Sequence, residues 1–186
     1  TSTNLTLIDT SLATNDLTLE LNSNLVLDGG SNLTVDGTVI FNGDGDINSF
    51  DGGLSLVDFS GATISKLGGA STSDITVRSI ATDLTLQNLA PNGVLRFNVY
   101  EQAWDDVHVV VDPDADVEFD VPITMTNMAI QSPASMFDRP TVTFRKPVDL
   151  GGTLSSSGEV NVVVTANFGD GRIPMGTVDC TSLLLE

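Results

Sequence analysis

Short segments in which apolar and polar residues alternate recur through the first half of the chain. Each has leucine, isoleucine or valine at every second position; they are Leu5–Leu7, Leu17–Leu21, Leu25–Leu27, Leu33–Val35, Leu54–Leu56, Ile75–Val77 and Leu84–Leu86. A period of two places the apolar side chains on one face of a β-strand. The pattern therefore predicts many short, half-buried strands and no helix beyond a turn or two.

Glycine punctuates the same stretch at regular intervals. It occurs at Gly29-Gly30, Gly37, Gly43, Gly52-Gly53, Gly61 and Gly68-Gly69, mostly in steps of six to nine residues. Such a step holds one short strand and a tight turn. Three steps make a coil of about 20–25 residues, which is typical of a parallel β-solenoid. We therefore expect residues 1–90 to form a repetitive, solenoid-like β region with continuous inward columns of apolar side chains.

An antiparallel β-sandwich or jelly roll throughout the chain is the alternative fold. Asp28-Gly29-Gly30 and Asp36-Gly37 resemble the turns of β-hairpins, and sandwich strands also recur at short intervals. The shortness of the alternating segments favours the solenoid, but the pattern alone leaves both folds open.

The character of the chain changes near Pro91-Asn92-Gly93. Six of the seven prolines follow this point, together with longer apolar stretches such as Val94–Tyr100 and Val107–Asp112. Proline is confined to loops, strand ends and edge strands. We therefore expect residues 91–186 to form a more irregular, β-sandwich-like module that caps the solenoid or mediates oligomerisation.

The composition limits the partners that the chain can have. There are 25 acidic and 7 basic residues, which gives a net charge of −18, and 20 of the acids are aspartate. Aspartate favours turns over helix interiors. A polyanion is repelled by nucleic acid and by anionic lipid. No apolar run approaches the roughly 20 residues that span a bilayer, so no membrane insertion is expected.

Residues 1–90 resemble the β-solenoid stretches of bacterial surface adhesins and of phage tail spikes or fibres. The features that carry the resemblance are the repeated Asn/Asp-Leu-Thr-Leu segments, as at Asp16–Leu19 and Asp83–Leu86, and the short strands between glycines. The resemblance covers about half of the chain and is generic. It implies an architecture and an extracellular or virion-surface location, and it transfers no functional residue.

The run Asp112–Asp120 is the most unusual local feature. In an extended strand its acidic residues project from one face and Ala115, Val117 and Phe119 from the other. Neighbouring carboxylates repel, so solvent, an arginine or a hard cation must relieve them. A solvent-facing strand is one interpretation, and Ca²⁺ bound by Asp112, Asp114 and Asp116 is the other. The segment Asn42–Asn48 is interpreted as a turn first and a cation site second.

The signatures of common enzymes are absent from the sequence. There is no Gly-x-Ser-x-Gly elbow, no phosphate-binding Gly-x-x-x-x-Gly-Lys loop and no His-Glu-x-x-His motif, and the one histidine, His108, lies in a plain strand pattern. A carboxylate pair can hydrolyse glycans, and Asp105-Asp106 lies near the aromatic residues Tyr100 and Trp104. A small glycan-active enzyme is therefore the least favoured of three functional hypotheses.

The favoured hypothesis is a non-catalytic structural or decoration subunit of a virion or extracellular assembly. Such a subunit would be a homo-oligomer or would join other structural subunits, because a solenoid has open strand edges at its ends. The sequence predicts large or adaptable apolar contact residues at Tyr100, Trp104, Met128 and Met136. The second hypothesis is a secreted adhesin that binds a cell-surface glycan through the Tyr100–Trp104 region. No cofactor is expected beyond the Ca²⁺ considered above.

Overall fold

The computed structural model describes residues 3–133, 139–165, 177–179 and 183–185, and every element in these residues is a β-strand. The strands form three sheets, called here A, B and C. Sheet A has nine strands in the order β1 (Thr3–Ile8), β4 (Ser23–Asp28), β7 (Asp46–Ser49), β10 (Thr72–Thr76), β13 (Val94–Asn98), β16 (Asp116–Asp120), β19 (Thr141–Phe144), β22 (Asn161–Val164) and β24 (Leu183–Leu185).

Sheets B and C complete each coil. Sheet B consists of β2 (Ser11–Thr14), β5 (Asn32–Val35), β8 (Leu56–Asp58), β11 (Arg78–Thr82), β14 (Gln102–Asp105), β17 (Ile123–Met125) and β20 (Val148–Leu150). Sheet C consists of β3 (Leu17–Glu20), β6 (Thr38–Asn42), β9 (Thr63–Gly68), β12 (Thr85–Asn88), β15 (Val107–Val111), β18 (Met128–Gln131), β21 (Thr153–Ser157) and β23 (Thr177–Asp179).

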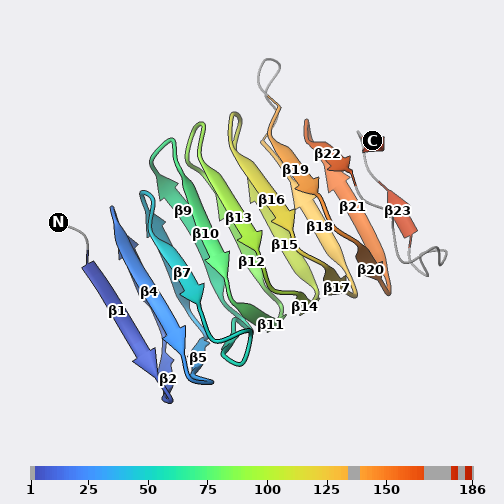
Figure 1. Ribbon diagram of the computed structural model, residues 1–186. Coiled ribbons are helices and arrows are strands. Elements are labelled where there is room, and N and C mark those ends of the chain that lie inside the picture. Colours follow the sequence, from blue (N-terminus) through green and yellow to red (C-terminus); the bar gives the residue numbers. More distant parts are fainter. Residues whose placement is uncertain (1–2, 134–138, 166–176, 180–182, 186) are drawn as a thin grey trace.

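From β1 to β22 the chain visits the sheets in the fixed order A, B, C and then begins the next coil. Each strand from β1 to β19 therefore pairs with the strand three elements later, whereas β21 pairs with β23 and β22 with β24; all of these pairs are parallel. In sheet A, Ile75, Phe97 and Phe119 are successive partners, 22 residues apart. The fold is a parallel β-solenoid of about seven turns, whose coils follow one another from the N-terminus toward the C-terminus in Figure 1. This confirms the solenoid and excludes antiparallel pairing among the described strands.

The expected irregular, sandwich-like second half is not shown. The strands from Val94 to Val164 continue the same three sheets, and parallel pairing runs without interruption across residues 90 and 91. Among the described residues, the prolines that suggested irregularity lie outside the strands; Pro122, for example, directly precedes β17 and Pro147 precedes β20. Because each coil has three corners, a solenoid accommodates proline without losing its strand ladders.

The interior of the solenoid is one core built from inward columns. Buried side chains alternate with outward ones along most strands, as the period-two pattern predicted; Leu25 and Leu27 are buried, as are Leu84 and Leu86. In sheet A the column becomes aromatic. The rings of Phe97, Phe119 and Phe144 stack with centroid separations of 5.5 and 4.9 Å, and the Trp104 ring packs edge-on against Phe119 at 5.8 Å.

Aspartate and asparagine turn many of the corners. Six such residues have left-handed backbone angles: Asp9, Asn22, Asp83, Asn92, Asp106 and Asp114. Among non-glycine residues, Asn and Asp tolerate this conformation best, because their short polar side chains bond locally to the backbone. The corners therefore account for part of the high aspartate content and for the Asn or Asp that precedes many strands.

Candidate functional site

A groove of about 520 Å³ lies at the corner where the chain passes from sheet A to sheet B, and it is called here the A/B groove. Its lining residues come from four successive coils: Gly52, Gly53, Arg78, Val99, Tyr100, Glu101 and Pro122. This volume lies in the range of small-ligand sites, about 300–1,000 Å³. The groove combines an aromatic ring, a guanidinium group, a carboxylate and glycine backbone, so it offers both polar and apolar contacts.

One wall of the groove is a loop that follows β7 and is longer than the other A/B connections (Figure 1). A side chain at Gly53 would lie 3.0 Å from the Tyr100 ring, so glycine is required for this close approach. The guanidinium of Arg78 donates to the carbonyl of Gly53 at 3.3 Å. The loop therefore extends past Arg78, which lies on the next coil, and contacts Tyr100 on the coil after that.

Asp51 holds this loop in place. Its carboxylate accepts six hydrogen bonds, from the backbone N–H groups of Gly30, Gly53, Leu54 and Ser55 and from the hydroxyls of Ser49 and Ser55. Partial burial raises the pKa of Asp51, but these bonds, led by that from the Ser55 hydroxyl, outweigh it and hold the pKa well below its ordinary value. The carboxylate thus stays ionised and the loop is pre-organised.

The opposite wall is a strained turn. Val99 has φ of 76°, and the N–H of Tyr100 donates to the carbonyl of Asn98 at 3.0 Å, which closes a three-residue γ-turn. A β-branched residue at positive φ is a rare outlier whose strain the surrounding structure must offset. The Val99 side chain is nevertheless 61% exposed, so burial does not compensate for the strain.

A buried polar chain fixes the strained turn from inside. The indole N–H of Trp104 donates to the Ser79 hydroxyl at 2.9 Å, and that hydroxyl donates to the side-chain oxygen of Gln102. The Gln102 amide then donates to the carbonyls of Val77 at 3.1 Å and Tyr100 at 2.5 Å. Every link is satisfied, and a satisfied buried network rigidifies what it contacts.

The four predicted interface residues occupy different environments. Trp104 and Met128 are buried in the core, so neither presents apolar surface to a partner. Tyr100 is partly exposed and lines the A/B groove. Met136 lies outside the described residues. Sequence reasoning missed Arg78, Val99 and the Asp51 loop, for which the only signal was the double glycine Gly52-Gly53.

The predicted calcium residues do not form one cluster. Asp112 and Asp114 belong to a corner turn, where Asp114 is exposed with φ of 63°, whereas Asp116 begins strand β16. The carboxylate of Asp116 accepts the N–H of Thr141 at 3.2 Å. Burial raises the pKa of Asp116, the Thr141 hydrogen bond opposes this shift, and the charges of Glu118 and Asp114 add to it. Within the described ranges, no group of three or more His, Cys, Asp or Glu could hold a metal ion.

Arginines pair with two acids on the outer face of sheet A, Asp74 and Glu118. The Arg96 guanidinium binds both carboxylate oxygens of Asp74, at 2.6 and 2.9 Å, and Arg145 donates to Glu118 at 2.9 Å. The hydrogen bond to Asp74 raises the pKa of Arg96 above its ordinary value. Among the forms of relief that the sequence left open, arginine is therefore the one that the structure shows within Asp112–Asp120, at Glu118.

The second cation candidate, Asn42–Asn48, lies at a corner between β6 and β7. Asp44 accepts the backbone N–H of Asn22 at 2.7 Å, and Asp46 accepts that of Asp74 at 2.8 Å. Their carboxylates point to backbone groups of the neighbouring coils, in agreement with the interpretation of this segment as a turn.

The carboxylates considered for glycan hydrolysis lie away from the A/B groove. Asp105 ends strand β14, and Asp106 forms the next corner, between sheets B and C. Tyr100 precedes the other end of β14, so at about 3.3 Å per residue the strand separates the pair from the tyrosine by more than 10 Å. His108 lies on β15 at the edge of a shallow hollow with Asn127, which itself donates to Asp106 at 2.6 Å.

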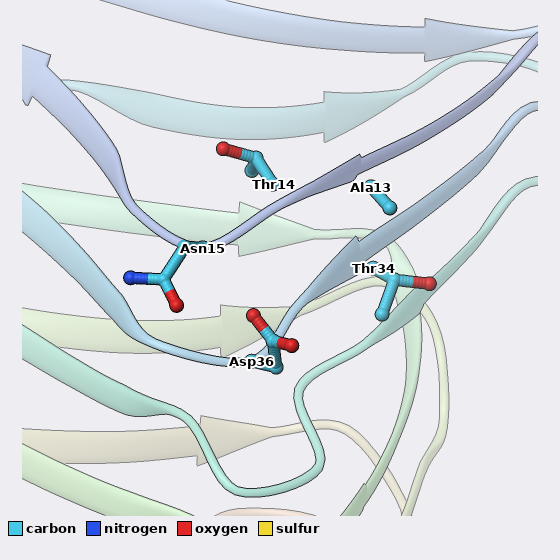
Figure 2. A pocket seen from close by; sticks show the side chains of 5 residues that line it. All are labelled: Ala13, Thr14, Asn15, Thr34 and Asp36. Carbon is cyan, nitrogen blue, oxygen red and sulfur yellow. The ribbon is translucent and has the colours of Figure 1, made fainter.

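A further concave patch, of about 260 Å³, lies on the first two coils and is shown in Figure 2. It is lined by Ala13, Thr14, Asn15, Thr34 and Asp36. The amide of Asn15 donates to Asp16 at 2.9 Å, and Asp16 accepts the N–H of Thr38 at 2.9 Å. These polar groups fix two stacked corners, which gives the patch a structural role.

Lys66 is a fully buried cation in the core column of sheet C. Its ammonium group donates to the carbonyl of Gly43 at 2.5 Å and to the Ser73 hydroxyl at 3.1 Å. Burial lowers the pKa of Lys66, and the charges of Asp44 and Asp46 oppose that shift. The fold thus holds a lysine that loses its proton more readily than a lysine of the unfolded chain.

We expect this lysine to give the protein a measurable pH dependence. Between the lowered pKa of folded Lys66 and its ordinary value of 10.5, the unfolded chain binds more protons, so stability attributable to Lys66 rises with pH. The difference in free energy of unfolding between the wild type and Lys66→Met should therefore shift in favour of the wild type as pH is raised toward 10. Urea denaturation measures both free energies. The exposed Lys146→Met variant is the control for loss of one positive charge. A constant difference between wild type and Lys66→Met would contradict this account.

Comparisons of the chain with protein-family models, with curated proteins and with solved structures find no match. The described residues contain no helix long and apolar enough to cross a membrane. The function must therefore be argued from the geometry of the solenoid itself.

Proposed function

We propose that the chain is a non-catalytic structural subunit of a virion or extracellular assembly, and that copies associate by stacking their coils end to end. One observation carries the proposal: within the described residues, the inward columns of the first coil are uncovered. Leu5 and Leu12 are 53% and 39% exposed, although they pair in register with Leu25 and Leu33, which are buried.

The backbone of the first coil is equally open. Strands β1, β2 and β3 stand at the ends of their sheets, so each has one row of backbone groups without a strand partner in the described chain. Open edges of this kind pair with other β-structure unless they are blunted by charge, proline or a covering segment. These three strands contain no proline, and Glu20 is their one charged residue. A second copy would extend all three sheets at once and cover the exposed leucines.

We expect the double variant Leu5→Lys/Leu12→Lys to abolish self-association without unfolding the protein. Both side chains are already substantially exposed, so the change removes little core packing, whereas two lysines placed in an apolar contact carry a large desolvation cost. Analytical ultracentrifugation should show oligomers for the wild type and monomers for the variant, with the same circular dichroism spectrum.

Leu67→Lys is the matched control, because Leu67 is 46% exposed but lies on β9, away from the first coil. It should leave the oligomeric state unchanged. Added salt should strengthen wild-type association, since two chains of charge −18 repel and salt screens that repulsion. A wild-type chain that stays monomeric at high salt, or equal association of all three proteins, would refute the stacking proposal.

A further inference from the structure

We infer that the A/B groove is a binding site for a neutral saccharide. This site lies on the side of the solenoid and is independent of the proposed stacking. Three features carry the inference: a strained turn that exposes a valine, a pre-organised glycine loop that approaches an aromatic ring, and a polar pair at the surface. The strained turn is costly for folding, and none of the three features is needed to continue the sheets.

The first feature is the γ-turn at Val99. The neighbouring coil passes the same corner through Val77 alone, without a positive φ, so the A/B corner does not require this conformation. The Trp104–Ser79–Gln102 hydrogen-bond chain holds the turn from the core. Strain that is retained and locked in this way is characteristic of binding and catalytic sites, where it fixes the geometry in advance.

The second feature is the loop Phe50–Leu54. The six hydrogen bonds accepted by Asp51 order the loop, yet Phe50 and Leu54 are 75% and 70% exposed. Ordering a loop before binding removes an entropic cost from the binding step. The loop also narrows the groove by placing Gly53 against the Tyr100 ring.

The third feature decides the class of ligand. Arg78 supplies donors, Glu101 supplies an acceptor, and Tyr100, Val99 and Pro122 supply apolar surface. A pyranose ring offers the complement, with an apolar C–H face and hydroxyl groups that both donate and accept. A peptide that binds by strand addition needs an open strand edge, but β8, β11 and β14 are each paired on both sides.

Charge selects among saccharides. The protein carries a net charge of −18, and the groove lining includes one arginine and one glutamate, so an acidic glycan gains no net attraction there and meets a repulsive field. The complementary ligand is therefore a neutral oligosaccharide.

The test is binding of an array of neutral oligosaccharides, with trigalacturonate as the acidic probe and an apolar extended peptide as the protein-like probe. Neutral ligands should be retained, and isothermal titration of the best of them should give an affinity that falls at least about tenfold in Tyr100→Ala. Arg78→Met should weaken the same ligand while leaving the fold intact, because the arginine is exposed.

Val99→Gly distinguishes a binding role from a structural one. Glycine adopts positive φ without strain, so this variant should melt about 2–6 °C higher than the wild type while binding the saccharide more weakly, because it loses the exposed valine and the rigid turn. Asn92→Gly is the control, since Asn92 also has positive φ, of 56°, but lies outside the groove; it should leave binding unchanged.

Several outcomes would overturn the inference. They are the absence of binding to any neutral saccharide, a preference for trigalacturonate or for the peptide, and binding that survives Tyr100→Ala. The first coil is intact in all these variants, so their oligomeric state should match that of the wild type. A failure of saccharide binding is therefore distinguishable from a failure of the stacking proposal.

Discussion

Replacing Phe119 by alanine is expected to lower the free energy of unfolding by about 3–5 kcal/mol, the range for a large aromatic side chain lost from a core. The Phe119 ring is fully buried and stacks at 5.5 Å on Phe97 and at 4.9 Å on Phe144, with Trp104 packed on its edge. These neighbours come from stacked coils that hold one another in register, so they cannot collapse into the cavity. Urea denaturation followed by tryptophan fluorescence measures the effect.

Phe50→Ala is the matched control, because it deletes the same side chain at a position that is 75% exposed. Its effect should stay within about 0.5 kcal/mol, as for surface substitutions in general. Equal destabilisation by the two substitutions would mean that Phe119 does not lie in a packed aromatic column. The comparison of the two variants therefore tests whether Phe97, Phe119 and Phe144 pair in register in sheet A, at residues far from the first coil.

The inward columns were predictable from the sequence because the period of a strand is two. In the coils after the first, alternating segments such as Leu33–Val35 and Leu84–Leu86 bury their apolar residues as expected, whereas Leu21 of the first-coil segment Leu17–Leu21 is exposed. Glycine spacing also indicated the coil length. Alternation alone did not decide strand direction, because it is the same in parallel and antiparallel sheets. The short glycine-bounded segments favoured the parallel solenoid, and the pairing across the 22-residue repeat confirms it.

The segment Leu54–Leu56 shows where alternation fails. Its leucines were expected to point inward, but Leu54 is exposed and Ser55 and Val57 are buried instead. The hydroxyl of Ser55 donates to Asp51, which satisfies its polar group in the interior. A hydrogen bond to a residue four positions earlier thus shifts the register by one, and this shift moves every side chain to the opposite face.

The site residues were harder to predict than the core. Trp104 shares its face with Gln102, and a glutamine beside a tryptophan suggests a mixed, exposed surface. Both are buried, because Ser79 from the preceding coil bonds to each of them. That partner is more than 20 residues away in sequence. Tyr100 was identified as a contact residue, but the groove around it depends on a loop from an earlier coil and on the conformation of Val99, neither of which leaves a local pattern.

Asn88→Ala should be the most damaging polar substitution, with a loss of about 3 kcal/mol in the free energy of unfolding. Asn88 lies inward on β12, between Lys66 and Val111 in the same column. Its amide donates to the carbonyls of Gly93 at 2.8 Å and Asp116 at 2.7 Å, and its oxygen accepts the N–H of Ala90 at 3.2 Å. Alanine removes all three bonds in the interior, where no replacement partner is at hand.

Asn48→Ala is the control for loss of an asparagine at the surface, where Asn48 accepts a single hydrogen bond, from the Thr76 hydroxyl at 2.6 Å. It should cost less than about 1 kcal/mol.

Asn88→Asp sharpens the test, because the aspartate keeps the size of the side chain but directs a carboxylate at two carbonyl oxygens. Its pKa should rise in the folded state, so the folded variant binds more protons than the unfolded chain and its stability falls as pH rises through that pKa. If the stability of Asn88→Asp relative to the wild type is the same at pH 7 as at pH 4, this account is wrong. The Asn88 side chain then does not join the carbonyls of Gly93 and Asp116.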